Sequence, residues 1–519
     1  MHVIDILIVI LYFVVVIGIG LVISKKTQTG EDLFLGGRTF TWGLVGLSLF
    51  ASNISSSTII GLSGAAYSTG VVNSFYEWGS AIPLVAAATI FVPLYLRAKI
   101  TTIPEFLELR YDARSRNFFS FITIFTSVIV EMSGGLYAGA LVVQFFIPEL
   151  ILWQTCLIIA FAAGLYTAFG GLKAVVYTDA IQAVILIIGC GVLTYILFGR
   201  LDFSWQRVLD AAPDNHFSMI RPIDDDTLPW LGMIVGAPLL GFWYFTTNQF
   251  IVQRVLGSKD IPNARWGIML AGLLKFIPLF IMVVPGAMAI SLFPGIDNPD
   301  MLFPTVMKEI LPVGLFGLVL AGLVSAIMSS VDSTLNSAST LIVVDFIKPR
   351  NPGLSDKKMA DYGRYTTLIL MVIAAIWAPL ISNFTGLWAY LQQMFSIIVP
   401  PVVVIFLVGV FDKRANGNAA IWTLIIGTLI GVLLFILGQL DLWHLHYTYN
   451  VGLVFAISSV IFMIIGRLGT APDPEKIERF TFRKELLSPS LDKHVPWYLD
   501  YRVHSVILLF VVLLIFLTF

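Results

Sequence analysis

The stretch Ala51-Ser52-Asn53-Ile54-Ser55-Ser56-Ser57-Thr58 decides the fold. It lies inside an apolar segment from about Trp42 to Tyr67, which is long enough to cross a bilayer. Six of the seven residues from Ser52 to Thr58 are polar, and broken backbone is tolerated in a membrane only inside protein or beside a wet cavity. The stretch predicts a helix that breaks in mid-membrane, with oxygens free to hold a cation and a polar solute. A serine-rich face packed against a neighbouring helix is the alternative.

The composition indicates a polytopic membrane protein. Of 519 residues, 58% are hydrophobic and 12% are charged, and the mean hydropathy is +0.90, far from a soluble average. The net charge of −1 gives no reason to expect a nucleic-acid partner. We expect an all-α polytopic protein with about fourteen transmembrane helices in a lipid bilayer. The apolar runs lie near residues 4–23, 42–67, 74–96, 117–147, 151–169, 174–198, 229–252, 266–293, 312–346, 364–382, 386–410, 418–438, 450–466 and 503–519.

Basic residues orient these runs. With both termini outside, the inside loops carry 26 of the 31 Lys and Arg residues, the outside loops carry four, and Lys275 lies within a span. Positive charge concentrates on the cytoplasmic side of membrane proteins, so this distribution favours that orientation. The longest inside loop, 467–502, is expected to form a cytoplasmic cap.

A second interruption echoes the first. The run Gly241-Phe-Trp-Tyr-Phe-Thr-Thr-Asn-Gln249 places polar residues in an apolar segment, five spans after the first break. Two interrupted spans at matching positions are typical of an inverted-repeat transporter.

Five ionisable residues stand out within the apolar runs: Glu77, Glu131, Asp179, Lys275 and Asp332. Each costs about 2.5–3.5 kcal/mol on insertion scales, so each needs an explanation. Glu77 lies beside aromatic residues, a combination that suits hydroxyl recognition, although an interfacial acid is the alternative. Lys275 is interpreted as a partner of Glu77, as a donor to solute oxygens, or as both. For Glu131 three interpretations stay open: a group that binds the solute, a group that carries a proton, or an acid paired structurally with another residue.

Small and hydroxyl residues form one stripe of a later helix. Ala326, Ser329, Ser330, Ser333 and Ser337 follow the helical spacing i, i+3, i+4, i+7 and i+11. Such a stripe by itself favours close packing. Together with the broken backbone near residue 51, it favours an oxygen cage for Na⁺, and the nearby acids Asp332 and Asp179 add charge that a second cation or a proton could neutralise.

Several long motifs, in order along nearly the whole chain, resemble the sodium/solute symporter family and its sodium/sugar (glucose, galactose or inositol) cotransporter branch. The motifs are Ala51-Ser-Asn-Ile-Ser, Gly61-Leu-Ser-Gly64, Tyr76-Glu-Trp78, Thr102-Ile-Pro-Glu-Phe-Leu-Glu108, Gly170-Gly-Leu-Lys-Ala-Val-Val-Tyr-Thr-Asp179 with Gln182, Thr247-Asn-Gln-Phe-Ile-Val-Gln-Arg254, Leu274-Lys275, Pro285-Gly286, and Ser329-Ser330 to Asn336-Ser337. The resemblance implies a core of two inverted five-helix repeats and solute uptake driven by Na⁺ as the coupling ion.

The resemblance also implies site residues by position. A sodium site would use the carbonyls of Ala51, Ile54 and Ala326 with the hydroxyls of Ser329 and Ser330. A second sodium site would use Asp179, Asp332 and Ser333. The solute site would use Glu77, Ser80, Lys275 and Gln392, with Tyr244 as the inner gate held by Asn53.

Three positions depart from the galactose-type pattern. Thr58 stands where an amide or imidazole contacts the sugar, Gly241 stands where a bacterial galactose carrier has Asn, and Glu131 stands where relatives have a neutral or basic residue. These departures leave the coupling site intact and put the particular solute in doubt.

The sequence therefore predicts a Na⁺-coupled symporter, and not an enzyme, that imports a hexose or polyol by alternating access. The alternatives are a symporter of an amino acid, a carboxylate or sialic acid, and, from another class, a channel or a membrane-embedded enzyme. We expect a peripheral segment 1–40, repeats 41–200 and 201–411, and peripheral spans 412–519, in a monomer or weak oligomer of a bacterial inner membrane.

Overall fold

The computed structural model describes residues 2–24, 30–384, 386–488 and 496–518. Within these ranges the chain is helical, and its one extended pairing is an isolated bridge between Phe40 and Ser258. Ten helices are long and apolar enough to cross a membrane, or up to twelve if each of two bent pairs counts as one span. Two shorter apolar helices, Val3–Val16 and Leu152–Phe161, fall in the first and fifth expected runs. The all-helical membrane fold is confirmed, while the number fourteen stays a prediction.

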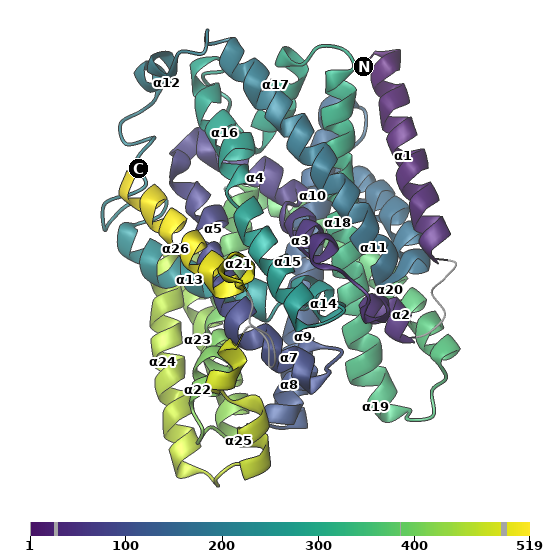
Figure 1. Cartoon of the computed structure of the whole chain (residues 1–519). Helices are drawn as coiled ribbons and strands as arrows, with labels where there is room; N and C mark the ends of the chain where they lie inside the picture. Colours follow the sequence, from purple (N-terminus) through teal and green to yellow (C-terminus); the bar gives the residue numbers. More distant parts are fainter. Residues whose placement is uncertain (1, 25–29, 385, 489–495, 519) are drawn as a thin grey trace.

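The first half of the chain contains the following helices (Figure 1): α1 (Val3–Ser24), α2 (Gly30–Leu35), α3 (Trp42–Asn53), α4 (Ser56–Thr69), α5 (Phe75–Trp78), α6 (Ala81–Ala86), α7 (Val92–Ala98), α8 (Ile103–Arg110), α9 (Ala113–Phe125), α10 (Ser133–Phe146), α11 (Leu152–Gly199) and α12 (Trp205–Ala211). A π-helical turn, Thr126–Met132, joins α9 to α10 in one span. A second π-helical turn, Ala87–Phe91, joins α6 to α7.

The second half contains α13 (Trp230–Thr246), α14 (Gln249–Leu256), α15 (Ile261–Leu274), α16 (Val284–Met288), α17 (Leu302–Ile310), α18 (Leu315–Leu341), α19 (Lys348–Arg350), α20 (Asp356–Trp377), α21 (Leu387–Val403), α22 (Gly409–Phe411), α23 (Gly417–Gln439), α24 (Tyr447–Leu468), α25 (Pro474–Phe480) and α26 (Tyr501–Thr518). In Figure 1, α12 and α17 lie at the top of the molecule, and α8, α19 and α25 lie at the bottom.

Both expected interruptions are present. The axis bends by 56° between α3 and α4, where the Ser55 hydroxyl accepts the backbone N–H of Thr58 at 3.1 Å. It bends by 47° between α13 and α14, where the Asn248 side chain accepts the N–H of Phe250 at 3.3 Å. Ser and Asn side chains satisfy the N–H groups that a new helix start leaves free, so each break carries its own cap.

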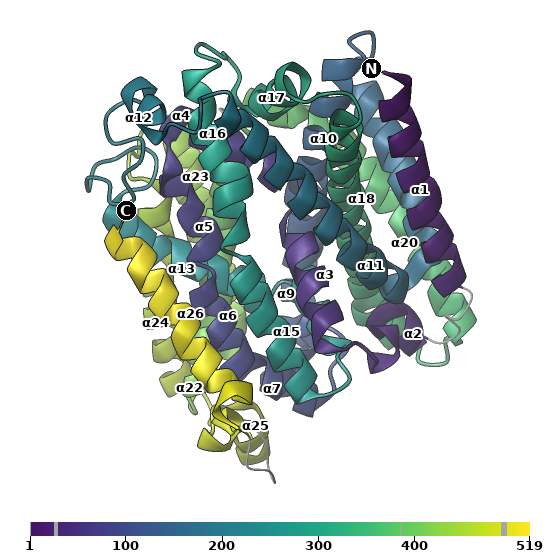
Figure 2. The ribbon, with the colours of Figure 1, turned by 45° about the horizontal axis from the view of Figure 1, so that its top comes forward.

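The broken pairs lie at the centre of the bundle. Helix α18 packs against α3, α4, α11 and α14, and α15 packs along α3. Figure 2 shows α3 and α15 between the long helices α11 and α18 on one side and α13 with α24 on the other. Helices α23 and α24 pair beside α21, and α26 lies along α15 and α6. Polar residues at the two breaks therefore face neighbouring helices.

A buried polar cluster ties the lower end of the bundle together. The Asp345 carboxylate, which follows α18, accepts hydrogen bonds from Arg116 at 2.6 Å, Ser120 at 2.6 Å and Thr102 at 3.0 Å. These donors come from α9 and from the residue that caps α8. Removing one partner of such a buried pair leaves an uncompensated charge, so the cluster holds these helix ends in a fixed relation.

Candidate functional site

A cavity of about 110 Å³ lies where the two breaks meet; we call it the central cavity. Its wall contains two carboxyl side chains, several hydroxyls and amides, and seven aromatic residues, a mixture typical of small-molecule sites. It is lined by Ser52, Asn53, Ser55, Ser57, Thr58, Tyr76, Glu77, Glu131, Leu240, Gly241, Trp243, Tyr244, Phe245, Phe250, Ser330, Thr334, Trp388, Leu391, Gln392 and Phe395.

Glu77 and Lys275 form a buried ion pair at this cavity. Lys275, which follows α15, also donates to the side-chain oxygen of Asn53 at the end of α3. The ammonium thus bridges Glu77, in the third expected run, and Asn53 at the first break. Because Glu77 lines the cavity while Lys275 lies behind it, the pair presents hydrogen-bonding oxygens to a solute without adding net charge.

The other expected solute residues divide into two groups. Gln392 and Tyr244 line the cavity, and the Tyr244 hydroxyl lies near the Asn53 side chain, while its role as a gate stays a prediction. Ser80 donates to the carbonyls of Tyr76 and Glu77 on its own helix instead. Its hydroxyl therefore supports the turn that carries Glu77.

Thr58 has a local structural role besides its place in the cavity wall. Its hydroxyl donates to the Asn53 carbonyl at 3.1 Å, so it satisfies a carbonyl freed by the break between α3 and α4. Because the Thr58 hydroxyl already donates this hydrogen bond, a solute could contact Thr58 only through its remaining atoms and lone pairs.

The expected sodium ligands come from the end of α3, at the first break, and from the neighbouring helix α18. Ala51 and Ile54 lie at the end of α3, and Ala326, Ser329 and Ser330 lie on α18, which packs against α3 and α4. All five are buried. The Ser330 hydroxyl donates to the Ala326 carbonyl at 2.7 Å and lines the central cavity. Carbonyl and hydroxyl oxygens are the hard ligands that alkali and alkaline-earth cations prefer.

Asp179 joins the two sides of that site. Its carboxylate accepts hydrogen bonds from Ser48 at 2.8 Å and Ser52 at 3.1 Å on α3, and from Ser329 on α18. It also forms an ion pair with the buried Arg254 of α14 at 3.2 Å. The network links α3, α11, α14 and α18, so displacement of one of these helices would disturb its contacts with the others.

Arg254 also reaches the residues expected for a second sodium ion. Its guanidinium donates to the Ser333 hydroxyl as well as to Asp179. Asp332, the third residue of that set, is buried on α18. A second ion at these residues would have to displace the guanidinium, and this second site stays a prediction.

Glu131 lies in the central cavity wall, on the π-helical turn Thr126–Met132. One carboxyl oxygen, Oε1, accepts a hydrogen bond from the Asn248 amide at 2.6 Å. The partner residue lies at the second break, between α13 and α14. This contact joins the fourth expected run to the second broken helix, and sequence reasoning did not anticipate it.

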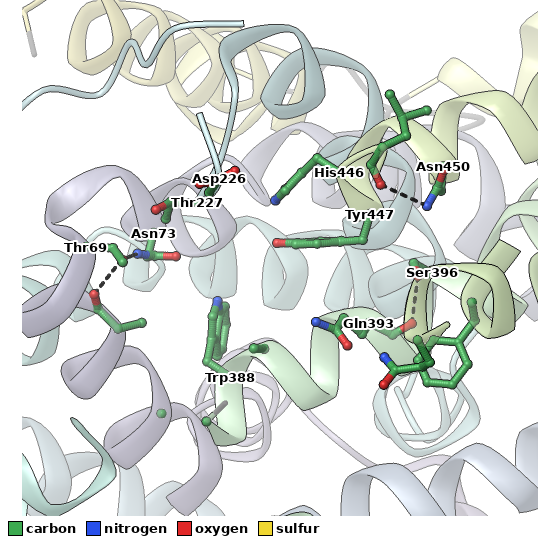
Figure 3. Close-up of a pocket in the computed structure, with 18 of the residues that line it drawn as sticks. Thr69, Asn73, Asp226, Thr227, Trp388, Gln393, Ser396, His446, Tyr447 and Asn450 are labelled. Carbon is green, nitrogen blue, oxygen red and sulfur yellow. Dashed lines mark hydrogen bonds between the residues drawn. The ribbon is translucent and has the colours of Figure 1, made fainter. Parts of the chain in front are cut away.

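A larger pocket of about 530 Å³ adjoins the central cavity; we call it the adjacent pocket. Trp388 lines both. Figure 3 shows Trp388 and Tyr447 reaching into the adjacent pocket, with Asn73 and Thr69 on one side and Asn450 on the other. At the boundary, the hydroxyl of Tyr76 meets that of Tyr447 in a hydrogen bond, and the Tyr76 ring packs edge-on against Trp388, with 5.5 Å between ring centroids. Three aromatic side chains thus separate the two spaces.

His446 and Asp300 are two of the titratable groups that line the adjacent pocket. His446 precedes α24, and burial lowers its pKa from 6.5 to about 4. Its Nδ1 accepts the backbone N–H of Thr448 at 3.4 Å. Asp300 precedes α17 and accepts the N–H of Leu387 at 3.1 Å, at the start of α21. Burial raises the pKa of its carboxyl.

Comparison with known proteins agrees with this arrangement. The sodium/glucose cotransporter 4 of Danio rerio is 33% identical over 91% of this chain and 80% of its own length. The sodium/myo-inositol cotransporter 2 of Oryctolagus cuniculus is 33% identical over 92% of this chain and 78% of its own. These relatives confirm the sugar and inositol branch that the motifs resemble.

Solved structures share the fold. A Na⁺-coupled sialic acid symporter superposes with a TM-score of 0.79 at 21% identity, over 91% of this chain and 99% of that chain. A nucleobase-cation-symport-1 family transporter superposes with a TM-score of 0.57 at 13% identity, over 88% and 99%. The model of one family covers residues 33–427, which include both broken helices, the central cavity and every residue expected to bind sodium. The chain is therefore a member of the sodium:solute symporter family.

Proposed function

We propose that this protein imports a small polyhydroxylated solute, a hexose or a cyclic polyol, together with Na⁺ by alternating access. The observation that carries the proposal is the buried Glu77–Lys275 pair at the wall of the central cavity. A neutralised carboxylate accepts hydrogen bonds from solute hydroxyls, and aromatic rings such as Trp388 cover the apolar face of a sugar or cyclitol ring. Relatives named for glucose and myo-inositol support the same solute class.

The same cavity disfavours an anionic solute. Besides Glu77, it contains the carboxyl of Glu131, and a like charge brought near a buried carboxylate costs free energy. Lys275, which could attract a carboxylate, is already paired. A sugar or polyol therefore fits this wall better than a sialic acid, a carboxylate or a zwitterionic amino acid.

For the coupling ion, we propose a sodium site made by the carbonyls of Ala51, Ile54 and Ala326 and the hydroxyls of Ser329 and Ser330. The site would span α3 and α18, so occupancy would favour the arrangement in which these helices are close. Since a ligand shifts a conformational equilibrium only by its differential affinity for the two states, a site shared by two moving parts is suited to coupling.

We further propose repeats at residues 41–200 and 201–411, because each range contains one bent pair of helices, α3–α4 or α13–α14. Segments 1–40 and 412–519 would be peripheral. The basic loops near α8, α19 and α25 lie at one end of the molecule, opposite α12 and α17 (Figure 1), which supports a cytoplasmic position for that end. Both termini would be outside, in a bacterial plasma membrane, and the transport unit would be a monomer or weak oligomer.

A thermal-shift screen of the purified protein tests the proposal. Sugars, polyols, amino acids and carboxylates are each added in Na⁺ and in K⁺, because a ligand that binds the native state raises its stability with the logarithm of saturation. We expect stabilisation by a sugar or polyol only in Na⁺, and none in Glu77→Ala. Stabilisation by an amino acid or carboxylate alone would overturn the solute class. Accumulation against a gradient in proteoliposomes, driven by Na⁺, would exclude a channel.

A further inference from the structure

Glu131 brings a second carboxyl to the central cavity. It lies on a π-helical turn in the middle of the span formed by α9 and α10, and it shares the cavity wall with Glu77. A mid-membrane acid is costly and requires a partner.

The partners of the two cavity carboxyls differ. Glu77 is neutralised by Lys275. Glu131 forms no ion pair with any residue that the structure describes. Its Oε1 accepts the Asn248 amide, whereas its buried Oε2 forms no hydrogen bond of normal geometry with the described side chains, and the Ser127 hydroxyl, also without another partner, lies near this carboxyl. One oxygen of this carboxyl is therefore available to a ligand.

The hydrogen bonds of Asn248 determine which atom of its side-chain amide faces the Glu131 carboxyl. The amide oxygen of Asn248 accepts the backbone N–H of Phe250, which fixes the amide nitrogen toward Glu131. Asn248 thus donates a hydrogen bond and supplies no charge. A buried carboxylate without a cation is strongly unfavourable, and a positively charged group on a ligand would compensate this charge as a proton would.

We propose that Glu131 is a specificity-determining residue that binds the ammonium group of an amino-substituted sugar or polyol. The inference rests on the proposed function and names the solute class within it. A hydrogen bond between an ammonium and a carboxylate is about twice as strong as a neutral one. The rings of Trp243, Tyr244 and Phe395 line the same small cavity, and aromatic faces attract a desolvated cation.

The test compares matched neutral and cationic solutes. Binding to the purified protein in Na⁺ is measured for glucose and for its 2-amino, 3-amino and 6-amino derivatives, and for myo-inositol and its amino-substituted isomers. Each pair differs by one hydroxyl exchanged for an ammonium. The variant Glu131→Gln keeps the size of the side chain and removes its charge, and Glu309→Gln, an exposed glutamate on α17, is the control.

We expect at least one amino derivative to bind the wild-type protein and Glu309→Gln about ten-fold more tightly than its neutral parent. In Glu131→Gln the two affinities should become about equal, with the neutral parent still bound. If every amino derivative binds more weakly than its parent in the wild type, the inference fails, and this result does not depend on whether Glu131→Gln folds. Sodium-dependent binding of the parent would in that case still support the proposed function. A preference that persists in Glu131→Gln would also overturn it. If neither neutral nor amino solutes bind in Na⁺, both proposals fail.

Discussion

The side-chain hydroxyls of Tyr76 and Tyr447 meet in a hydrogen bond at the boundary between the central cavity and the adjacent pocket. Tyr76 belongs to α5, within the third expected run, whereas Tyr447 begins the peripheral helix α24. A helix outside the proposed repeats thus contributes directly to the barrier above the cavity. Trp388, on α21, completes that barrier.

Replacing Tyr447 by Phe should weaken the barrier. Loss of the hydrogen bond leaves the partly buried Tyr76 hydroxyl without this partner, at a cost of about 1 kcal/mol, which shifts an open–closed equilibrium about five-fold. The measurement is the rate at which a hydrophilic thiol reagent, added from the adjacent-pocket side, labels Leu240→Cys in the central cavity wall. We expect labelling about five-fold faster in Tyr447→Phe.

Tyr449→Phe is the matched control for this experiment. Tyr449 lies half a turn further on α24, and its hydroxyl donates to the Ile223 carbonyl, away from the barrier. Its loss should leave labelling unchanged. Equal labelling rates in both variants and the parent would show that the tyrosine pair does not limit access.

The Glu77–Lys275 pair should respond differently to single and double substitution. Lys275→Met leaves Glu77 buried and unpaired, which we expect to cost about 3–5 kcal/mol in stability. The double variant Glu77→Gln/Lys275→Met removes both charges and should recover most of this loss. Solute binding should be lost in both. The readouts are thermal unfolding and ligand-induced stabilisation in Na⁺.

The double variant separates two roles of the pair. Recovered stability without recovered binding would show that the charges recognise the solute. Binding in the double variant at wild-type strength would place the solute elsewhere in the protein.

Substitution of Ser330 should change the response to sodium and leave folding intact. Ser330→Ala removes one of five proposed ligands, and a loss of about 1.4 kcal/mol corresponds to a ten-fold higher sodium concentration for half-maximal uptake. Ser339→Ala serves as the control, since Ser339 is buried on the same helix but donates to the Gly363 carbonyl. Identical sodium dependence in Ser330→Ala and the wild type would rule out the proposed cage.

Some of this arrangement follows from sequence pattern. The breaks at Ser55 and Asn248 were predictable because polar, helix-capping residues interrupt apolar runs, and broken backbone is tolerated in a membrane only inside protein or beside a wet cavity. Glu77 and Lys275 were candidates because each is a costly charge in a span. That the two form a pair depends on how α5 and the end of α15 approach each other, which local pattern does not encode.

Other features carried no signal in the sequence. Tyr447 is one of many aromatic residues near a span end, where they are common in any membrane protein. The contact of Glu131 with Asn248 joins residues 117 positions apart, and the position of Arg254 beside Ser333 depends on the packing of α14 against α18. Spacing on one helix reveals which residues share a face, but the partner of that face is set by the tertiary fold.

Acid should destabilise the protein through His446. Because burial lowers its pKa from 6.5 to about 4, the folded state binds fewer protons at this residue than the unfolded state. Its contribution to stability is therefore fully present above pH 6.5 and is lost as the pH falls toward 4, by about 2 kcal/mol at pH 5.

We expect His446→Asn, which keeps an acceptor for the Thr448 N–H, to lose less stability between pH 7 and pH 5 than the wild type. Thermal unfolding across this range, with His444→Asn on the same loop but exposed as the control, provides the measurement. If His446→Asn and His444→Asn show the same acid sensitivity as the wild type, protonation of His446 does not contribute to unfolding, and the carboxyl groups alone account for it.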